Sequence, residues 1–231
     1  MGMFLRRGYA PHRTRFSDLA VERTIKLNWA GTPWEWLVVQ QGLPSDIYDV
    51  SCDGTWLLMK DCYEPRQWNN NSSNVLETST VHSYLNGDFI NLFDDNIKNN
   101  IKQVKIPYRK NGGLNGTDMH GANGLPCKVF LLSAPEVGWA PSENIGVSGD
   151  GAKLAYFEAG NGTAATNKRI AKWNGSSITY WLRSPDTRDV DITAWVRATG
   201  NYGRNIPTNK AGIRSALILP SDMFVTDDML A

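Results

Sequence analysis

Short apolar runs separated by turn residues dominate the first half of the sequence. Aromatic and β-branched residues from Trp34 to Val39 favour a strand, and a second run from Thr55 to Lys60 follows the tight-turn dipeptide Asp53-Gly54. Two strands with a turn signal between them predict a β-hairpin.

Helical periodicity appears further along the chain. Apolar residues recur at three-to-four spacing from Val81 to Leu85, and Asn86-Gly87 is expected to stop that run. Phe89, Leu92 and Phe93 then continue an apolar face. The range 94–102 repeats the pattern over a short length, with Ile97 and Ile101 facing inward. We therefore expect two short helices here.

The second half of the chain mixes short strands with long loops. Residues 104–107 and 128–133 favour strands on either side of a Gly- and Asn-rich surface loop, 111–124. Residues 135–172 show no regular pattern. No period of about 20 to 50 residues repeats, which excludes solenoids and propellers.

The last third regains order, with strands expected at 179–183, 191–197 and 212–219. The middle strand alternates, so one face is expected to be buried and the other to face water. The buried face would carry Ile192, Ala194 and Val196, and the wet face Asp191, Thr193, Trp195 and Arg197. Few helices, many short strands and long loops predict an α+β domain with short twisted antiparallel sheets.

Charge narrows the classes of partner. The 231 residues carry 24 basic and 23 acidic side chains and a formal net charge of +1, so no global field attracts nucleic acid or a membrane surface. No run of about 18 apolar residues occurs that could insert into a membrane. The N-terminus lacks the long apolar stretch of a signal peptide, and we expect synthesis in a cytoplasm.

The three cysteines are Cys52, Cys62 and Cys127, and they sit in no CxxC pair and have no His at metal-ligand spacing. Free thiols in the core are the favoured interpretation. A disulfide between Cys52 and Cys62 across the hairpin is the alternative.

Residues 1–30 differ from the rest of the chain, because their basic and aromatic residues outnumber the acidic ones. We interpret this segment as an N-terminal arm in front of a domain spanning residues 31–231. The arm either packs on its own domain or anchors the protein in an assembly through a partner. The residues proposed for assembly are Phe4, Arg6, Arg7, Tyr9, Arg13, Arg15 and Phe16.

Three sequence blocks carry a family resemblance: residues 36–39, then 83–89 with Phe93 and Ile101, then 180–185 with 212–217. In this order they resemble an uncharacterised family of bacterial and phage domains with a WLN..F...F helix, a WLRSP strand and a terminal G.RPAL strand. The resemblance spans residues 32–220 and departs at Ser215, where that family usually has Pro.

That family is similar to the C-type-lectin-like fold, which is shared with formylglycine-generating enzymes and with phage receptor-binding proteins diversified by retroelements. The resemblance implies a C-type-lectin-like domain, although a fold alone does not give a function. In the WLRSP strand we expect Trp181 to fill a core and Arg183 to fork its guanidinium onto backbone carbonyls. Arg214 is interpreted as structural in the same way.

The motifs tested for chemistry give no catalytic residue. His12, His82 and His120 lie in no nucleophile-elbow sequence, and neither GxGxxG nor GxxxxGK[ST] occurs. The formylglycine-generating relatives need a copper-binding cysteine pair near the C-terminus, and no cysteine follows Cys127. Paired carboxylates for glycosidase chemistry cannot be chosen without geometry.

Four aspartates, Asp150, Asp186, Asp189 and Asp191, could supply oxygen ligands to Ca²⁺. The EPN and WND tripeptides of calcium-dependent lectins are absent. The expectation is therefore no metal and no cofactor.

The connection between the strands at Trp181 and Gly212 mixes aromatic residues, Arg and Asn, as binding surfaces do. In the diversified phage proteins the equivalent segment faces the ligand. An ordinary polar sheet face with a solvated loop is the alternative. The residues proposed to bind a ligand are Arg188, Asp191, Thr193, Trp195, Arg197, Asn201, Tyr202, Arg204 and Asn205.

These expectations lead to a non-enzymatic phage virion protein that displays a ligand-binding domain. Its arm would contact other virion proteins, and its ligand would be a host-surface protein or glycan. A homo-oligomer is expected for a protein of this class. A virion decoration or glue protein is the first alternative, and an enzyme on the same fold is the second.

Overall fold

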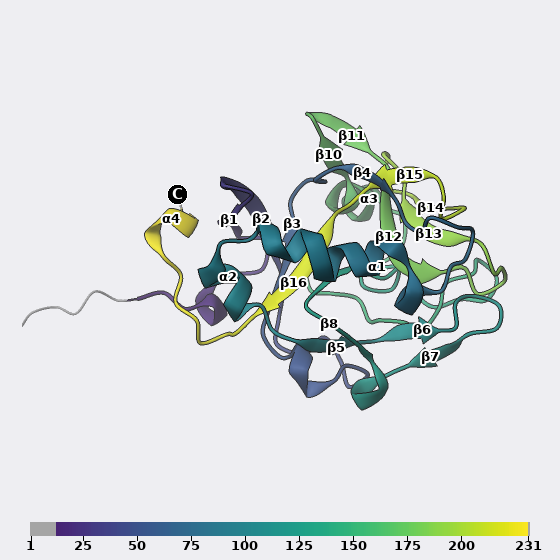
Figure 1. Cartoon of the computed structure of the whole chain (residues 1–231), viewed down its shortest axis with the longest axis horizontal. Helices are drawn as coiled ribbons and strands as arrows, with labels where there is room; N and C mark the ends of the chain where they lie inside the picture. The colour runs from purple at the N-terminus through teal and green to yellow at the C-terminus, as the bar shows by residue number, and fades with distance from the viewer. Residues whose placement is uncertain (1–12, 231) are drawn as a thin grey trace, which may run out of the picture.

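Two five-stranded sheets carry the fold of the computed structural model, which describes residues 13–230 (Figure 1). The first sheet is antiparallel, in the order β1 (Thr24–Trp29), β2 (Thr32–Gln41), β3 (Thr55–Met59), β16 (Ser215–Leu219) and β9 (Val129–Leu131). Every residue of the central strands β3 and β16 is buried. The expected hairpin is confirmed as the pair β2 and β3.

The second sheet has the order β14 (Tyr202–Asn205), β13 (Thr193–Val196), β12 (Tyr180–Pro185), β15 (Lys210–Gly212) and β4 (Pro65–Gln67). Its pairs are antiparallel except for β12 with β15, which are parallel. The described residues also form three two-stranded ladders: β5 (Val104–Ile106) with β8 (Leu125–Cys127), β6 (Tyr108–Lys110) with β7 (Thr117–Met119), and β10 (Ala171–Trp173) with β11 (Ser176–Ile178).

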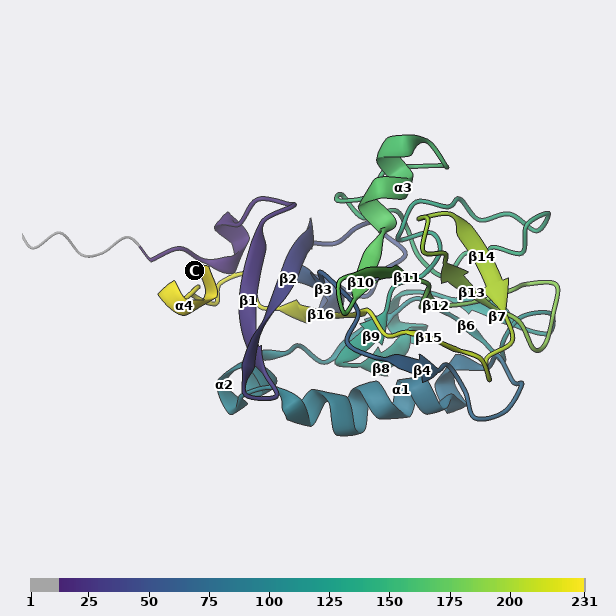
Figure 2. The ribbon, with the colours of Figure 1, turned by 90° about the horizontal axis from the view of Figure 1, so that it is seen from above.

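A helical rod lies along one side of the molecule (Figure 2). It consists of α1 (Thr80–Tyr84), a π-helical turn over Leu85–Phe89 and a 3₁₀ turn over Ile90–Leu92. The expectation that Asn86-Gly87 stops the helical run is therefore wrong, because the rod continues through this dipeptide.

The side chain of Asn86 explains the π-helical turn. Its Nδ2 donates to the carbonyl oxygens of His82 at 3.1 Å and Val129 at 3.0 Å. Its Oδ1 accepts from the backbone N–H groups of Lys128 at 2.8 Å and Val129 at 3.2 Å. A π-helical turn is a common site for such an insertion into the helix ladder, and here it ties the rod to β9.

The remaining helices are short. They are α2 (Asp95–Asn100), α3 (Thr163–Arg169) and α4 (Asp227–Leu230), with 3₁₀ turns at Phe16–Asp18, Val50–Cys52, Leu76–Thr78 and Gly121–Asn123. Ile97 and Ile101 are buried, as predicted for the second helix. The fold is thus of the α+β class, with mostly short antiparallel sheets and few helices. None of the helices in residues 13–230 is long and apolar enough to cross a membrane.

Completely buried tryptophans form the centre of the core: Trp29, Trp36, Trp56, Trp68 and Trp181. Trp29 packs on Phe89 with ring centroids 5.0 Å apart, and Trp36 packs on Phe93 at 5.7 Å. These contacts join the first sheet to the helical rod. Each buried aromatic ring contributes a large apolar area to the stability of the fold.

Residues 212–219, expected as one strand, form strands in two different sheets. β15 lies in the second sheet, and β16, which begins at Ser215, lies in the first. Between them the buried guanidinium of Arg214 donates to the carbonyl oxygens of Met59 at 2.9 Å and Lys60 at 3.1 Å. Arg214 therefore has the structural role expected for it, because it binds the end of β3 at the point where the chain passes from the second sheet to the first.

The described part of the N-terminal segment belongs to the domain. Phe16 is completely buried, its N–H donates to the carbonyl of Met223, and the N–H of Val225 donates to the carbonyl of Thr14. β1 then forms an edge of the first sheet. Residues 13–30 therefore pack on their own domain, which is the first of the two alternatives for this segment.

The other residues proposed for assembly divide into two groups. Arg13 and Arg15 stack over the ring of Phe224, with guanidinium carbons 5.7 and 5.6 Å from its centroid, and so help to hold the two ends of the chain together. Four of the proposed residues lie outside the described part of the chain: Phe4, Arg6, Arg7 and Tyr9.

The three cysteines Cys52, Cys62 and Cys127 are buried free thiols, as predicted. Burial raises the pKa of Cys52 to about 11 and that of Cys62 to about 12. The alternative disulfide across the hairpin is not formed. These thiols pack as small apolar groups.

Candidate functional site

A buried polar network lies under the second sheet and is centred on Arg183. Its guanidinium forms a two-pronged ion pair with Glu136, with both contacts at 2.6 Å. It also donates to the carbonyl oxygens of Pro107, Leu131 and Asp150. The prediction that Arg183 forks onto carbonyls is confirmed, whereas its pairing with Glu136 was not foreseen.

The electrostatics of this network follow from its burial. Burial alone would lower the pKa of Arg183, but the Glu136 carboxylate raises it above the usual value. Burial, with the nearby Glu136 charge, raises the pKa of Tyr48, whose hydroxyl donates to Glu136 at 2.9 Å. Arg183, Glu136 and Tyr48 therefore satisfy one another's hydrogen-bonding groups inside the protein.

Asp150 forms the edge of the network nearest to the surface loops. Its carboxylate is completely buried and accepts from the hydroxyl of Ser184 at 2.9 Å. Burial raises its pKa to about 6, although the positive charge of Arg183 opposes that shift. Asp150 therefore changes its protonation close to neutral pH.

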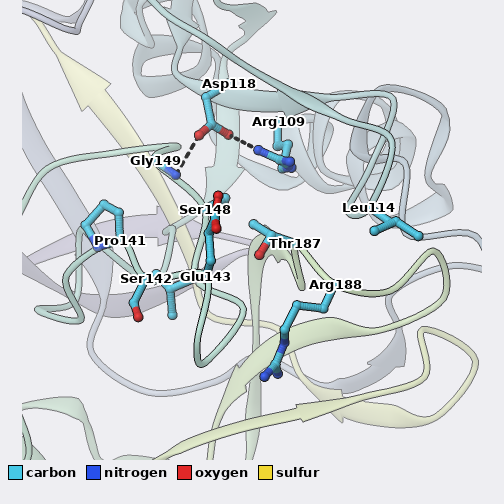
Figure 3. Close-up of a pocket in the computed structure, with 11 residues that line it drawn as sticks. Arg109, Leu114, Asp118, Pro141, Ser142, Glu143, Ser148, Gly149, Thr187 and Arg188 are labelled. Atoms are coloured by element: carbon cyan, nitrogen blue, oxygen red, sulfur yellow. Dashed lines mark hydrogen bonds and ion pairs between the residues drawn. The ribbon is translucent and has the colours of Figure 1, made fainter.

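A cleft of about 620 Å³ opens beside this network, between the β6–β7 ladder, the loop 141–149 and the residues that follow β12 (Figure 3). Its volume lies in the range of small-molecule sites. The cleft is lined by Arg109, Leu114, Asp118, Pro141, Ser142, Glu143, Val147, Ser148, Gly149, Thr187 and Arg188.

Asp118 joins two walls of the cleft, as the dashed lines in Figure 3 show. One of its oxygens accepts from Nη1 of Arg109 at 3.1 Å, and the other accepts from the N–H of Gly149 at 2.8 Å. The carboxylate thus fixes the loop 141–149 against β6 and β7.

Asn74 joins the other wall to the ladder. Its buried amide accepts from the N–H of Gly113 at 3.1 Å and donates to the carbonyl oxygens of Asp189 at 3.1 Å and Ile192 at 2.9 Å. At Gly113 any Cβ would collide with the carbonyl oxygen of Asp186, so this approach requires glycine. The walls are therefore held in place before any ligand enters.

Two hydroxyl groups at the cleft have no hydrogen-bond partner among residues 13–230. They are Oγ of Ser148, a residue with only 2% of its surface exposed, and Oγ1 of Thr187. Ser148 lies close enough to Asp150 to help lower the pKa of that carboxyl, yet it makes no hydrogen bond of ordinary geometry. Four more buried hydroxyls of the described residues also lack a partner, those of Ser45, Thr193, Tyr202 and Ser215, so this state is not peculiar to the cleft.

A charged cluster of Asp186, Arg188, Asp189 and Arg204 borders the cleft. Nη2 of Arg188 lies 2.9 Å and Nη1 of Arg204 lies 2.7 Å from the same oxygen of Asp186. Burial alone would raise the pKa of Asp186, but the hydrogen bonds from the two guanidinium groups lower it overall. Nη1 of Arg188 also donates to the carbonyl of Asn144, so Arg188 braces the cleft loop.

The structure divides the predicted ligand-binding residues between the two faces of the β13–β14 hairpin. The register pairs Val196 with Tyr202 and Ala194 with Arg204, and paired residues share a face. Tyr202 and Arg204 therefore lie on the face that meets the Asp186 cluster, and Arg204 forms ion pairs within it.

The opposite face of the hairpin carries Trp195, with Thr193 and Arg197 at alternate positions of the same strand. The expectation of a wet face here is wrong for two of these side chains. Thr193 is completely buried, and Trp195 is half-buried because its ring packs on Trp181 with centroids 5.2 Å apart. Arg197 is exposed.

The other predicted ligand residues stay at the margins of the hairpin. Asp191 precedes β13 and is half-buried, Asn201 is exposed in the turn, and Asn205 accepts from the N–H of Ile206 at 2.9 Å. Asn201 donates to Thr199 at 3.2 Å. None of the three lines the cleft.

Three of the four aspartates considered as calcium ligands have other partners. Asp186 and Asp189 bind guanidinium groups, and Asp150 accepts from Ser184. In the part of the chain that the structure describes, no group of three or more His, Cys, Asp or Glu side chains could hold a metal ion.

Sequence reasoning missed most of the cleft. Asp118 lies in the segment interpreted as a surface loop, and Ser148 lies in the segment without a regular pattern. The available signal was the density of glycine at 112–113 and 149–151, which permits close backbone approach. That signal marks turns equally well, so it could not identify a site by itself.

The fold and the cleft define an α+β domain with a preformed polar site at one end. Residues 53–221 of this chain match the family described as "Domain of unknown function (DUF6273)", and the chain belongs to that family. All the residues that line the cleft lie inside the matched range, whereas β1, β2 and α4 lie outside it. Comparisons with curated proteins and with solved structures find no match.

Proposed function

We propose that the protein is a non-enzymatic binding module whose ligand occupies the cleft. One observation carries this proposal: hydrogen bonds of Asp118 and Asn74 connect the walls of a cleft of about 620 Å³, and two buried hydroxyls within these walls, on Ser148 and Thr187, have no partner among residues 13–230. Ligand pockets are usually formed before the ligand binds and contain a few polar groups that contact it, and this cleft has both properties.

The hydrogen bonding of the acidic and basic groups supports binding rather than catalysis. Glu136 is engaged by Arg183 and Tyr48, and Asp150 by Ser184. Asp118, which does line the cleft, is held between Arg109 and Gly149. These partners give each of the three carboxylates a structural task, whereas Glu143 lines the cleft without an ion pair among the described residues.

The finer fold that we propose is C-type-lectin-like, and the support for it is the ordered set of sequence blocks. In such a domain the connection between β12 and β15 would contribute to recognition. The geometry favours a ligand surface made of the cleft with Arg188, Tyr202 and Arg204 beside it. Trp195 would serve the core of the hairpin instead.

We further propose that the module is displayed on a phage particle. The support is the resemblance of the sequence blocks to bacterial and phage domains, together with the placement of the ends of the molecule. β1 and α4 lie at one end, and β6, β7, β13 and β14 lie at the other (Figures 1 and 2). Attachment to other virion proteins near the chain ends would leave the cleft facing outward.

Binding of the labelled full-length chain to a panel of intact bacterial strains, measured by flow cytometry, tests this proposal. The cleft variant Ser148→Ala/Thr187→Val removes both free hydroxyls with little change in volume. We expect saturable binding by the wild type and at least a tenfold loss of affinity in the cleft variant, about 1.4 kcal/mol or more.

The matched control is Ser177→Ala/Thr163→Val, which removes two exposed hydroxyls far from the cleft. It should bind like the wild type. Equal binding by all three proteins, or no binding by any, would contradict recognition through the cleft.

The second candidate function is a decoration that stabilises a particle without binding a host. The observation that favours it is the packing of Arg13 and Arg15, near the N-terminus, over the ring of Phe224, near the C-terminus. All three residues lie outside the matched family range. Particles assembled with the cleft variant distinguish the two: a decoration would keep its stabilising effect, and host adsorption would be unchanged.

A further inference from the structure

We infer that the cleft and the turns around it bind residues 3–9 of a second copy of this chain. The inference rests on the proposed function only in using the same cleft as a binding site, and it adds a contact between copies. It follows from apolar side chains exposed on the turns, from a carboxylate without an ion pair, and from the composition of residues 3–9.

Three aliphatic side chains are exposed on turns around the cleft. They are Leu114, Ile145 and Val190, with exposed fractions of 58%, 45% and 53%. Leu114 and Ile145 lie inside tight turns that span residues 113–116 and 143–146. Turns preferentially carry Gly, Pro, Asn, Asp or Ser, so aliphatic residues at these places indicate a contact surface.

Hydrogen bonds hold these turns next to one another. The N–H of Leu114 donates to the carbonyl of Asp189 at 2.9 Å, directly before Val190. Nη1 of Arg188 donates to the carbonyl of Asn144 at 2.7 Å, in the turn that carries the exposed isoleucine. The three aliphatic side chains therefore belong to one connected group of turns. Neighbouring exposed apolar residues of this kind mark sites of protein contact.

The cleft and the cluster beside it carry one negative charge in surplus. The three arginines of this region pair with three aspartates at distances between 2.7 and 3.1 Å, and these residues are Arg109, Arg188, Arg204, Asp118, Asp186 and Asp189. Glu143 also lines the cleft, is exposed, and makes no ion pair among residues 13–230. Its carboxylate is therefore free to attract a cationic side chain.

Residues 3–9 have the complementary composition. Their sequence is Met-Phe-Leu-Arg-Arg-Gly-Tyr, and residues 1–12 contain no Asp or Glu. Phe4 and Leu5 can cover the exposed aliphatic side chains, and that contact removes apolar surface of both partners from water. Arg6 or Arg7 can then pair with the carboxylate that lacks an ion pair. Adjacent residues of the segment thus supply both kinds of contact that this surface offers.

The positions of the two regions in the fold favour contact between copies. Arg13 and Arg15 pack over Phe224 at the end of the molecule where β1 and α4 lie. The β6–β7 ladder, which contributes Arg109 and Asp118 to the cleft, lies at the other end (Figures 1 and 2). A contact that joins opposite ends is head-to-tail, and its repetition builds a row of copies. The outermost copy of such a row keeps an open cleft for the ligand of the proposed function.

Sedimentation velocity of the full-length chain, at concentrations from about 1 to 200 µM, tests the inference. We expect the mass of the wild type to rise with concentration. Arg6→Glu/Arg7→Glu and Glu143→Arg should each remain monomeric, because like charges then meet at the contact. Combining the three substitutions in one chain restores opposite charges and should restore association.

Asp88→Arg is the matched control for the change of charge. It alters an exposed carboxylate on the helical rod, outside the cleft, and should associate like the wild type. A wild type that is monomeric at every concentration, or association that persists in Arg6→Glu/Arg7→Glu, would overturn the inference.

A labelled synthetic peptide of residues 1–12 measures the contact directly. Fluorescence anisotropy follows its binding to the full-length variant Arg6→Glu/Arg7→Glu, whose own segment does not compete. We expect saturable binding that becomes at least tenfold weaker when Leu114→Ser/Val190→Ser is added. Raising the ionic strength from about 0.05 to 0.5 M should weaken it at least threefold, because salt screens the ion pair.

Leu43→Ser/Val50→Ser is the control for the apolar contact, since it alters two exposed aliphatic side chains outside the cleft. It should leave the affinity for the peptide within twofold. Thermal unfolding shows that each variant is folded. Absence of saturable binding, or equal losses in the two pairs of substitutions, would contradict the assigned surface.

The outcomes separate the inference from the proposed function. If the peptide does not bind while Ser148→Ala/Thr187→Val loses binding to bacteria, the inference is wrong and the proposed function stands. If that variant binds bacteria like the wild type while the peptide depends on Leu114 and Val190 as expected, the contact between copies stands and recognition of a host through the cleft is wrong.

Discussion

At the scale of single residues, buried ions and polar groups hold together the loops that build the site. Arg183 bonds to Glu136 and to three carbonyl oxygens from separate segments of the chain. Burying two charges is costly unless each has a complete set of partners. Removing only one partner of the Arg183–Glu136 pair should therefore lower the stability more than removing both.

Replacing Glu136 by Gln leaves the guanidinium of Arg183 buried without a counter-charge. We expect the free energy of unfolding to fall by about 3 to 5 kcal/mol, measured by urea denaturation. The double variant Arg183→Met/Glu136→Leu, which removes both charges, should lose less stability than Glu136→Gln. A small effect of Glu136→Gln would show that water or another group compensates Arg183.

Asp150 provides a prediction about pH. Its pKa is raised to about 6 in the folded protein, so between about pH 4 and 6 the folded state binds more protons than the unfolded state. Stability contributed by the protonated group is therefore lost as pH rises through this window. The loss is on the order of 3 kcal/mol by pH 7.

Asp150→Asn keeps the shape of the side chain and an acceptor for Ser184, but it cannot ionise. We expect its free energy of unfolding to vary less than that of the wild type between pH 4 and 7, and to exceed the wild-type value most clearly at pH 7. Denaturant titrations at several pH values measure the difference. Parallel curves for the two proteins would refute the raised pKa.

At the scale of elements, the helical rod shows how tertiary contacts override a local signal. Asn86-Gly87 is a common helix end, yet Asn86 bonds to His82, Lys128 and Val129 and carries the helix onward as a π turn. Its partners come from the previous helical turn and from residues 128–129 at the start of β9. A local sequence pattern contains the helical turn but not the strand, so it could not predict these contacts.

Asn86→Ala should therefore destabilise the protein strongly, because it leaves buried backbone groups at the start of β9 without partners. We expect a loss of about 2 to 4 kcal/mol in urea denaturation. Asn91→Ala is the matched control, since Asn91 makes one exposed bond to Gly87. A loss of less than about 1 kcal/mol in Asn86→Ala would show that the π turn does not depend on this amide.

Local patterns predicted those elements whose stability is local. The strand from Trp34 and the helix with Ile97 and Ile101 depend on alternation and periodicity that a window of sequence contains. The division of residues 212–219 between two sheets depends on what Arg214 meets across the molecule. The alternation of β13 failed for Trp195 because Trp181 covers it.

The site was predicted less well than the fold for the same reason. Arg188, Tyr202 and Arg204 were found because the strand order placed their segment correctly, and the buried Asp186 then gathers the two arginines. Asp118 and Asn74 act across long distances in sequence. Nothing in their local context distinguishes them from ordinary loop residues.

At the scale of the whole molecule, the residues outside the family domain form one end of the structure. β1, β2 and α4 flank the matched range 53–221, and Phe16 is buried where the two chain ends meet. This end packs as part of the domain. The β6–β7 ladder, which contributes Arg109 and Asp118 to the cleft, lies at the other end (Figures 1 and 2).

Phe16→Ala tests whether residues 13–30 contribute to the stability of the domain. Loss of a completely buried ring should lower the free energy of unfolding by about 3 to 5 kcal/mol. Phe224→Ala, which removes a ring that is 42% exposed, should cost clearly less. If both variants had equal, small effects on thermal unfolding, residues 13–30 would not contribute to the stability of the domain.

The central claim is that ligand binds in the cleft and not on the Trp195 face of the hairpin. Amide and indole chemical-shift mapping by NMR, with cell-surface material released from the bacterial strain that binds most strongly, tests it directly. We expect shifts at Leu114, Gly149 and Arg188, with the indole N–H of Trp195 unchanged. Shifts at Trp195 and Arg197 with an unperturbed cleft would contradict it.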